Sequence, residues 1–192
     1  MAIDVEGIVI DALLELVEDE EVPLERVTVK RLLECSGVSR QTFYNHFLDK
    51  NDLICRVYER RMVHAFTGAP TGFAYRDELE RSLATMREHG SFMQQAAKMK
   101  GQNNLTDHII ERTQKFDLDW HQSLWGAEPM PDELRLATMY HAMASVHMAL
   151  SWILSGFPAP EAELATLITS MRGIGMERLF EGAQTPGNPY AF

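Results

Sequence analysis

The chain has 192 residues, of which 45% are hydrophobic and 24% charged, so its composition is that of an ordinary globular protein and not of a disordered or fibrous one. Its net charge of −10 argues against a protein that coats nucleic acid by bulk attraction. Because its two cysteines are too few for a disulfide framework, its first residues lack the basic start of a signal peptide, and no apolar run reaches about 18 residues, we expect a soluble, cytoplasmic protein that does not span a membrane.

Charge is distributed unevenly along the chain. Residues 1–25 contain nine acidic residues and no Lys or Arg, whereas residues 26–62 contain eight basic residues against four acidic ones. A short basic block in an acidic chain indicates a local contact with nucleic acid. The alternative is a solvated, charged helix face, which is the default for a block with no other pattern.

The first two helices are predicted from apolar periodicity and capping. Apolar residues recur at helical spacing over residues 5–18, and Asp4 stands before them as a potential N-cap. A short helix over residues 29–36 starts behind Thr28, whose hydroxyl can accept a hydrogen bond from the first turn. Gly37 ends that helix, because glycine tolerates the positive φ that a helix C-cap requires.

A third helix follows after a tight turn. Ser39 is its predicted N-cap, and the pattern breaks near Leu48. Phe43 and Phe47 are four residues apart, so they share a helix face, which we expect to point inward. The polar residues between and before them are left on the outward side: Arg40, Gln41, Tyr44 and Asn45.

The remainder of the chain is also predicted to be helical. Asp49 caps a helix that continues to about Phe66, and Gly68, Pro70 and Gly72 indicate a linker. The further helices expected cover residues 76–89, 91–100, 105–125, 131–155 and 160–181. The fold class is therefore all-α, with a three-helix domain over residues 1–50, a larger helical regulatory and dimerisation domain over residues 51–181, and an irregular tail over residues 182–192.

The two short helices on either side of Gly37 form a helix-turn-helix pattern, in which the second helix places its first side chains in the major groove of DNA. Guanidinium and amide groups suit base edges, and a phenol suits phosphate. A tight helical corner with no role in DNA binding is the alternative. The segment from residue 28 to residue 53 is moreover similar to the TetR family of bacterial transcriptional regulators, in its Thr28-initiated helix, Gly37-Val38-Ser39, Thr42, Phe43-Tyr44, Phe47, Lys50 and Leu53.

This resemblance implies roles by position. The residues matched to phosphate contacts are Thr28, Thr42, Tyr44, His46 and Lys50, and those matched to base contacts are Lys30, Arg40, Gln41 and Asn45. Arg31, Ser36 and Gln41 depart from the family's usual residues, so the base preference does not transfer. Arg31 could contact a phosphate or pair with Glu34 on the same helix.

The resemblance also implies a homodimer in which the last two long helices of each subunit form a four-helix bundle. The nearly all-round apolar helix over residues 131–155 supports this independently, because it needs cover on most sides. Such a dimer would bind a palindromic operator in double-stranded DNA, with its recognition helices roughly 34–36 Å apart or somewhat more. An effector that is a small, largely apolar molecule is implied as well, and its candidate lining residues are Phe92, Met93, Met99, Phe116, Trp120, Leu124, Tyr140, Met143 and His147, each of which is otherwise an ordinary core residue.

Other chemistry is sparse. Asp117, His121, His141 and His147 could form a metal site, but no ligand motif supports it, and we expect no metal and no cofactor. No catalytic motif is present, so we do not expect an enzyme. Cys35 is expected to be a small buried side chain. Two alternatives stay open: a regulator whose larger domain binds a partner protein, and, more distantly, a helical enzyme that uses His121 or His147.

Overall fold

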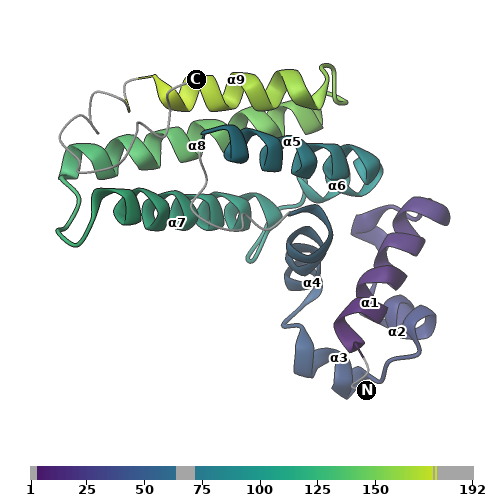
Figure 1. Ribbon diagram of the computed structural model, residues 1–192. Coiled ribbons are helices and arrows are strands. Elements are labelled where there is room, and N and C mark those ends of the chain that lie inside the picture. The colour runs from purple at the N-terminus through teal and green to yellow at the C-terminus, as the bar shows by residue number, and fades with distance from the viewer. Residues whose placement is uncertain (1–3, 64–71, 175, 177–192) are drawn as a thin grey trace. The chain divides into compact units, whose positions relative to one another are not determined.

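The computed structural model describes residues 4–63, 72–174 and 176, and every regular element within them is helical (Figure 1). The expected all-α fold is confirmed. The described residues of Met1–Val63 and Met86–His108 form one compact unit, called unit 1, and those of His64–Thr85 and Ile109–Phe192 form a second, called unit 2. No helix in these ranges is long and apolar enough to cross a bilayer.

Unit 1 contains the helix-turn-helix. Helix α1 packs against α2 and α4, and α6 packs against the segments η1 and η2. Its elements are α1 (Val5–Leu14), the π-helical turn η1 (Glu15–Asp19), the 3-10 turn η2 (Leu24–Arg26), α2 (Val29–Ser36), α3 (Arg40–His46), α4 (Lys50–Val57), the π-helical turn η3 (Tyr58–Met62) and α6 (Gly90–Ala96).

Side-chain caps fix where the helices of unit 1 begin. Each cap satisfies a backbone N–H that has no partner inside the helix and stabilises the helix by about 1 kcal/mol. The four predicted caps are confirmed: Asp4 Oδ1 accepts from Gly7 N at 3.0 Å, Thr28 Oγ1 from Arg31 N at 3.2 Å, Ser39 Oγ from Thr42 N at 3.1 Å, and Asp49 Oδ1 from Asp52 N at 2.8 Å.

Gly37 ends α2 as predicted. It has φ 67° and ψ 8°, and its N–H donates to the carbonyl of Leu33 at 3.0 Å. A Cβ at this position would meet no atom within 4 Å, so space does not require glycine here. The left-handed backbone does, and it turns the chain sharply between α2 and α3.

Unit 2 is built from four long helices that Figure 1 shows lying alongside one another. Helices α5 and α7 are each divided between the units, at Thr85 and His108 respectively. A stacked pair, Tyr75 and Trp120, lies at the centre of a core cluster with Leu134. The helices are α5 (Gly72–Glu88), α7 (Leu105–Trp125), α8 (Asp132–Leu154) and α9 (Glu161–Gly173).

Some predicted boundaries were wrong. The helix after Asp49 stops at Met62, because the N–H of Val63 bonds to the carbonyl of Tyr58 and closes a π-helical turn. Gly72 is the first residue of α5 and not part of a linker. The helix expected to reach residue 100 stops at Ala96. Gly68, Pro70, residues 177–181 and the expected tail over residues 182–192 lie outside the described part of the chain.

The compact units also differ from the expected domain limits. Unit 1 runs on to Val63 and includes residues 86–108, whereas the expected DNA-binding domain ends at residue 50. Apolar periodicity predicts helices but not the element against which each one packs, so the return of α6 to η1 and η2 could not be foreseen. The functional boundary after residue 50 stays a prediction.

Candidate nucleic-acid interface

Helix α3 holds an outward polar ridge on two buried aromatic rings. Phe43 and Phe47 are 0% and 1% exposed, and their ring centroids are 5.1 Å apart. Tyr44 meets Phe43 edge-on at 5.3 Å and keeps 45% of its surface exposed. Arg40 lies over the Tyr44 ring at 5.6 Å, and Gln41 and Asn45 are exposed beside it. The predicted inward and outward faces of α3 are therefore confirmed.

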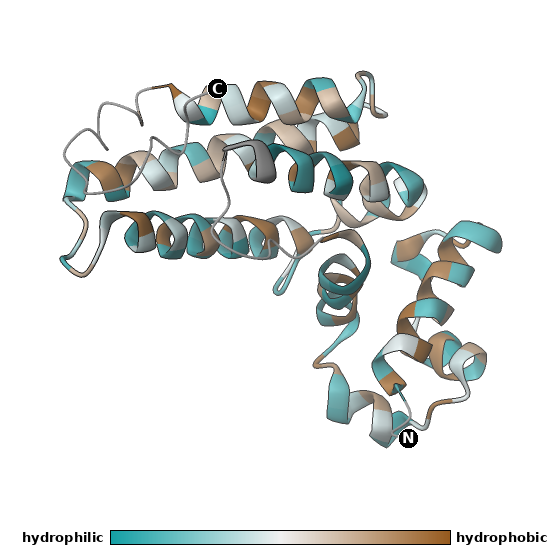
Figure 2. Ribbon diagram, in the orientation of Figure 1, coloured by the Kyte–Doolittle hydropathy of each residue, from teal (hydrophilic) through white to brown (hydrophobic). Residues whose placement is uncertain are grey.

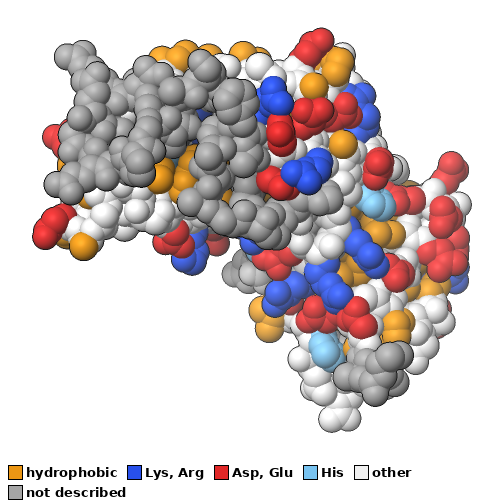
Figure 3. All heavy atoms as spheres, in the orientation of Figure 1, with side chains coloured by type: hydrophobic (Ala, Val, Ile, Leu, Met, Phe, Trp, Pro, Cys, Tyr) orange, Lys and Arg blue, Asp and Glu red, His pale blue; other side chains and the backbone are white. Residues whose placement is uncertain are grey.

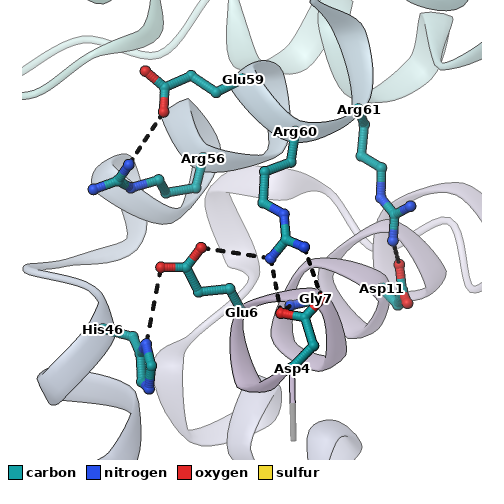
Figure 4. Close-up of polar contacts among 9 residues, drawn as sticks. All are labelled: Asp4, Glu6, Gly7, Asp11, His46, Arg56, Glu59, Arg60 and Arg61. Carbon is teal, nitrogen blue, oxygen red and sulfur yellow. Dashed lines mark hydrogen bonds and ion pairs between the residues drawn. The ribbon is translucent and has the colours of Figure 1, made fainter. Parts of the chain in front are cut away.

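The two threonines matched to phosphate contacts already bond within the protein. Thr28 uses its hydroxyl oxygen to cap α2 and remains exposed at the helix start. The Thr42 hydroxyl lies 2.7 Å from that of Ser39. His46 is exposed, with Nδ1 3.9 Å from a carboxylate oxygen of Glu6 (Figure 4). The phosphate contacts predicted for these three residues stay predictions.

Lys50 is a clamp inside unit 1. Its ammonium group is half-buried, and burial lowers its pKa while the charge of Glu25 opposes that shift. An ammonium has three N–H donors, and all three point to carbonyl oxygens of the chain just before α2. These acceptors are the carbonyls of Leu24 at 3.0 Å, Glu25 at 3.1 Å and Val27 at 3.0 Å. All three donors of Lys50 thus have partners inside the protein. The phosphate contact predicted for Lys50 stays a prediction.

The two arginines of η3 pair with the acidic helix α1 (Figure 4). Arg60 donates to both carboxylate oxygens of Asp4 at 2.9 and 2.7 Å and to Glu6 at 3.5 Å. Arg61 pairs with Asp11. The hydrogen bond from Arg60, together with that from the Gly7 N–H, holds the pKa of Asp4 well below its usual range.

Other basic residues of residues 26–62 are paired as well. Arg31 binds Glu20 at 2.9 Å in place of the pair with Glu34 that was one alternative for it, and the phosphate contact that was the other stays a prediction. Within the described residues, Arg26, Arg40 and Lys50 are the basic residues of this block that form no ion pair, and Lys50 donates instead to backbone carbonyls. The remaining pairs are Lys30 with Glu34 at 3.8 Å and Arg56 with Glu59 at 3.2 Å.

Much of the positive charge of this block is therefore paired inside the protein, and the contact with nucleic acid that the block indicates stays a prediction. Acids from residues 1–25 fold back onto its arginines, and Figure 3 shows Lys and Arg side chains beside Asp and Glu on the face drawn. Pairs between exposed charges contribute about 0–1 kcal/mol each to stability, but they cancel much of the local field. The outward face of α3 is therefore mainly polar, with Arg40 as its arginine.

The cysteines behave differently from each other. Cys35 was expected to be buried, but it is exposed, because the core face of α2 is occupied by Leu32, which is 0% exposed. Cys55 is buried on α4. Burial, with the charges of Asp52 and Glu59 nearby, raises the pKa of the Cys55 thiol to about 12. Cys55 therefore remains a protonated, unreactive thiol at neutral pH.

The nine residues named as candidate effector lining fall into three groups, and the lining that they predict stays a prediction. Three belong to unit 1, three lie in or against the aromatic cluster of unit 2, and three are exposed on α8. In that order they are Phe92, Met93 and Met99; Phe116, Trp120 and Leu124; and Tyr140, Met143 and His147.

A buried ion pair, missed from the sequence, lies beside the aromatic cluster of unit 2. Arg172 and Asp117 have side chains that are 2% and 0% exposed, and Arg172 Nη2 lies 2.5 Å from Asp117 Oδ1. Arg172 Nη1 also donates to the Tyr75 hydroxyl at 2.6 Å. Burial raises the pKa of Asp117, and the positive charge of Arg172 opposes that shift. The sequence offered no signal for Arg172, which interrupts an otherwise apolar stripe.

His121 is held neutral in the same cluster. The Thr138 hydroxyl donates its only proton to the carbonyl of Leu134 at 2.8 Å, so it accepts from His121 Nδ1–H at 2.7 Å. Burial, with the charge of Arg172, lowers the pKa of His121 to about 3. In the described residues no group of three or more His, Cys, Asp or Glu side chains is arranged to hold a metal ion.

Acidification is expected to destabilise the protein through His121. The pKa of His121 is about 3 in the folded protein and about 6.5 in the unfolded chain, so acidification protonates the unfolded chain before the folded protein. Between pH 7 and pH 5 this uptake costs about 2 kcal/mol of unfolding free energy. Urea unfolding at both pH values should show that His121→Gln loses about 2 kcal/mol less than the wild type. Equal losses would contradict the assignment.

The outer face of α8 and α9 is apolar. Of the ten large hydrophobic residues that are substantially exposed in the described part of the chain, six lie on these two helices and a seventh, Ile174, directly follows α9. Their spacing of three and four residues is that of a helix–helix seam. Figure 2 shows hydrophobic and hydrophilic positions interspersed along α9, and Figure 3 shows hydrophobic side chains along its outer edge. The residues are Leu136, Tyr140, Met143 and Leu154 on α8, and Leu167, Met171 and Ile174 at α9.

Comparison with known proteins agrees with this architecture. No protein-family model matches the chain, and no curated protein is similar to it in sequence. Among solved structures, the dihydroxyacetone kinase operon activator DhaS is 18% identical, with a TM-score of 0.64 over 92% of this chain and 98% of its own. A TetR-family transcriptional regulator from Streptomyces coelicolor is 19% identical, with a TM-score of 0.63 over 94% of this chain and 84% of its own. The chain has the fold of these proteins.

Proposed function

We propose that the chain is a TetR-type transcriptional regulator: a homodimer that binds a specific DNA operator and whose affinity is controlled by a small, largely apolar effector. The observation that carries the proposal is α3, which Ser39 caps, Phe43 and Phe47 anchor, and polar side chains cover on the outside. The fold shared with an operon activator and a TetR-family regulator supports it.

The exposed side chains of α3 match the hydrogen-bonding groups of the major groove. Arg40 can donate two hydrogen bonds to guanine, and Gln41 and Asn45 can each bond adenine through their amides. The Tyr44 hydroxyl can donate to a phosphate, while its ring holds the Arg40 guanidinium at 5.6 Å. Because this contact limits the rotamers of Arg40, less conformational entropy is lost on binding.

Selection of bound duplexes from a random pool tests DNA recognition and symmetry at once. We expect a palindromic site to be enriched, with half-sites about one helical turn or somewhat more apart. Recovery of random sequences only, or of a single asymmetric half-site, would contradict the proposed dimeric regulator.

Gln41→Ala is expected to relax the preference at one base pair of each half-site. Loss of the amide removes base-specific hydrogen bonds, at a cost of about 1–3 kcal/mol for the preferred base and little for the others. Titration of the selected duplex and of its single-base variants measures this. Gln102→Ala truncates an exposed glutamine outside the helix-turn-helix and keeps its backbone carbonyl, which accepts from Asn51, so it should leave every affinity unchanged. If Gln41→Ala weakens all duplexes equally, Gln41 does not contact a base.

The exposed face of α8 and α9 supports the homodimer. An apolar seam of this kind on both helices buries its surface when a second copy applies the same face across a two-fold axis. Four helices would then pack around a shared core, as in a helical bundle. Tyr140, Met143 and His147 belong on this face in the proposed dimer, and no longer among the effector contacts.

The effector is proposed to bind at the aromatic cluster of unit 2. Tyr75 and Trp120 stack at 5.7 Å, with Phe116 6.3 Å from Trp120, and Arg172 and Asp117 supply polar groups beside them. An aromatic compound with one or two polar groups fits these side chains. A thermal-shift screen of such compounds is expected to find ligands that raise the unfolding temperature. Trp120→Ala, checked for folding, should remove the shift. A screen in which nothing stabilises the protein would contradict this part of the proposal.

A further inference from the structure

The turn η2, directly before the helix-turn-helix, is fixed by side chains distant in the sequence. Gln95 on α6 accepts a hydrogen bond from the Leu24 N–H at 2.8 Å. Lys50 at the start of α4 binds three carbonyls of the same turn, on both sides of Arg26. A surface turn is ordinarily free to move, but here its backbone groups have partners on α4 and α6. The Cα of Arg26 is therefore held in place.

This position belongs to the side of the motif that meets DNA backbone in known complexes. Arg26 precedes Thr28, the N-cap of α2, by two residues, and Lys50, which binds the turn, follows the last residue of α3 by four. In a docked helix-turn-helix the first helix crosses the sugar–phosphate backbone while the second enters the groove. A cation just before the first helix is therefore placed at the phosphates that flank the groove.

The side chain of Arg26 suits that place. It is exposed, and among the described residues it has no acidic partner, in contrast to Arg31, Arg60 and Arg61. A guanidinium can bind a phosphate with two parallel hydrogen bonds. Glu25 is adjacent, but its charge lies beside the Lys50 ammonium, which raises the pKa of Lys50 against the effect of burial.

We propose that Arg26 contacts a DNA phosphate and that Lys50 acts as a positioning residue, which holds the turn from which Arg26 projects. The proposal rests on the proposed DNA-binding function and adds two points to it. It assigns a contact outside α2 and α3, and it gives Lys50 a role inside the protein in place of a direct phosphate contact.

The dependence of affinity on salt tests the contact. Each phosphate neutralised contributes about 0.9 to the slope of log affinity against log salt, so Arg26→Ala should lower the slope of a dimer by about 1.8. Between 50 and 200 mM salt, the variant should then lose about tenfold less affinity than the wild type. Arg26→Lys should retain the slope. The probe is the duplex that the wild-type protein selects from a random pool.

Arg56→Ala is the matched control. Arg56 on α4 is exposed and pairs with Glu59 in the following turn η3, so its removal changes the net charge equally without removing a proposed contact. A slope for Arg56→Ala equal to that of the wild type supports the proposal. If Arg56→Ala lowers the slope as much as Arg26→Ala does, Arg26 acts only through the net charge of the protein, and the proposal is overturned. If the wild type binds the duplex but Arg26→Ala keeps the full slope, this inference fails while the proposed function stands. If the wild type selects no duplex, both fail.

A double variant tests the role of Lys50. In a Lys50→Met protein whose helical content matches the wild type, the turn is no longer held, so Arg26→Ala should change the slope by less than half as much as it does alone. Two independent phosphate contacts would instead give additive losses, which would overturn the positioning role. If Lys50→Met does not fold, the Lys50 clamp is structural as proposed, and the comparison of Arg26 with Arg56 decides the phosphate contact.

Discussion

Arg172→Met is expected to lower the free energy of unfolding by about 3–5 kcal/mol, the typical cost of breaking a buried ion pair by removing one partner. Asp117 is 0% exposed and lies 2.5 Å from Arg172, so the variant leaves a carboxylate without its counter-charge in the core. The Tyr75 hydroxyl loses its bond from Arg172 in the same step. Urea unfolding at pH 7, followed by circular dichroism, measures the difference.

Two further variants make this result specific to the pair. Arg135→Met breaks an exposed pair with Asp132 and should cost at most about 1 kcal/mol. Combining Arg172→Met with Asp117→Leu removes both charges and should recover most of the lost stability, because well-packed apolar residues often replace a buried ion pair without loss. A double variant as unstable as the single one would show that packing, and not the orphaned charge, sets the cost.

The parts of this protein that sequence predicts well are those that local interactions determine. The bounds of α2 follow from a hydroxyl and a glycine within one turn of its ends, and the inward face of α3 follows from two phenylalanines four residues apart. Both depend on neighbours along the chain, and both are confirmed.

The charge pattern shows where such reasoning stops. The acids of residues 1–25 and the arginines after residue 30 are visible in the sequence, but their pairing depends on how α1 packs on α4. Arg60 reaches Asp4 across 56 positions, and Arg172 reaches Tyr75 across 97. Arg31, for which the sequence left a phosphate contact open, is thus half of an internal pair with Glu20. The contacts of the Lys50 ammonium were equally invisible, because they end on backbone carbonyls that no side-chain pattern reveals.

Leu167→Glu is expected to convert the proposed dimer to a monomer and to lower operator affinity by about 10²- to 10⁴-fold. Leu167 is 51% exposed, and with Met171 and Ile174 it forms the apolar stripe of α9. Across a two-fold axis each substitution occurs twice, so two carboxylates would enter one apolar seam and lose their hydration. A monomer engages a single half-site and forfeits the effective concentration that links the two recognition helices.

Light scattering at micromolar concentration and titration of the selected duplex measure the two effects on the same protein. Thr166→Glu is the matched control, because it introduces the same charge on an exposed residue about 100° around α9 from Leu167. It should remain dimeric and bind normally. A monomeric wild type would contradict both the proposed dimer interface on α8 and α9 and the proposed palindromic operator. If Leu167→Glu is monomeric but keeps full operator affinity, the apolar face of α8 and α9 forms the dimer, but dimerisation through it is not required for DNA binding.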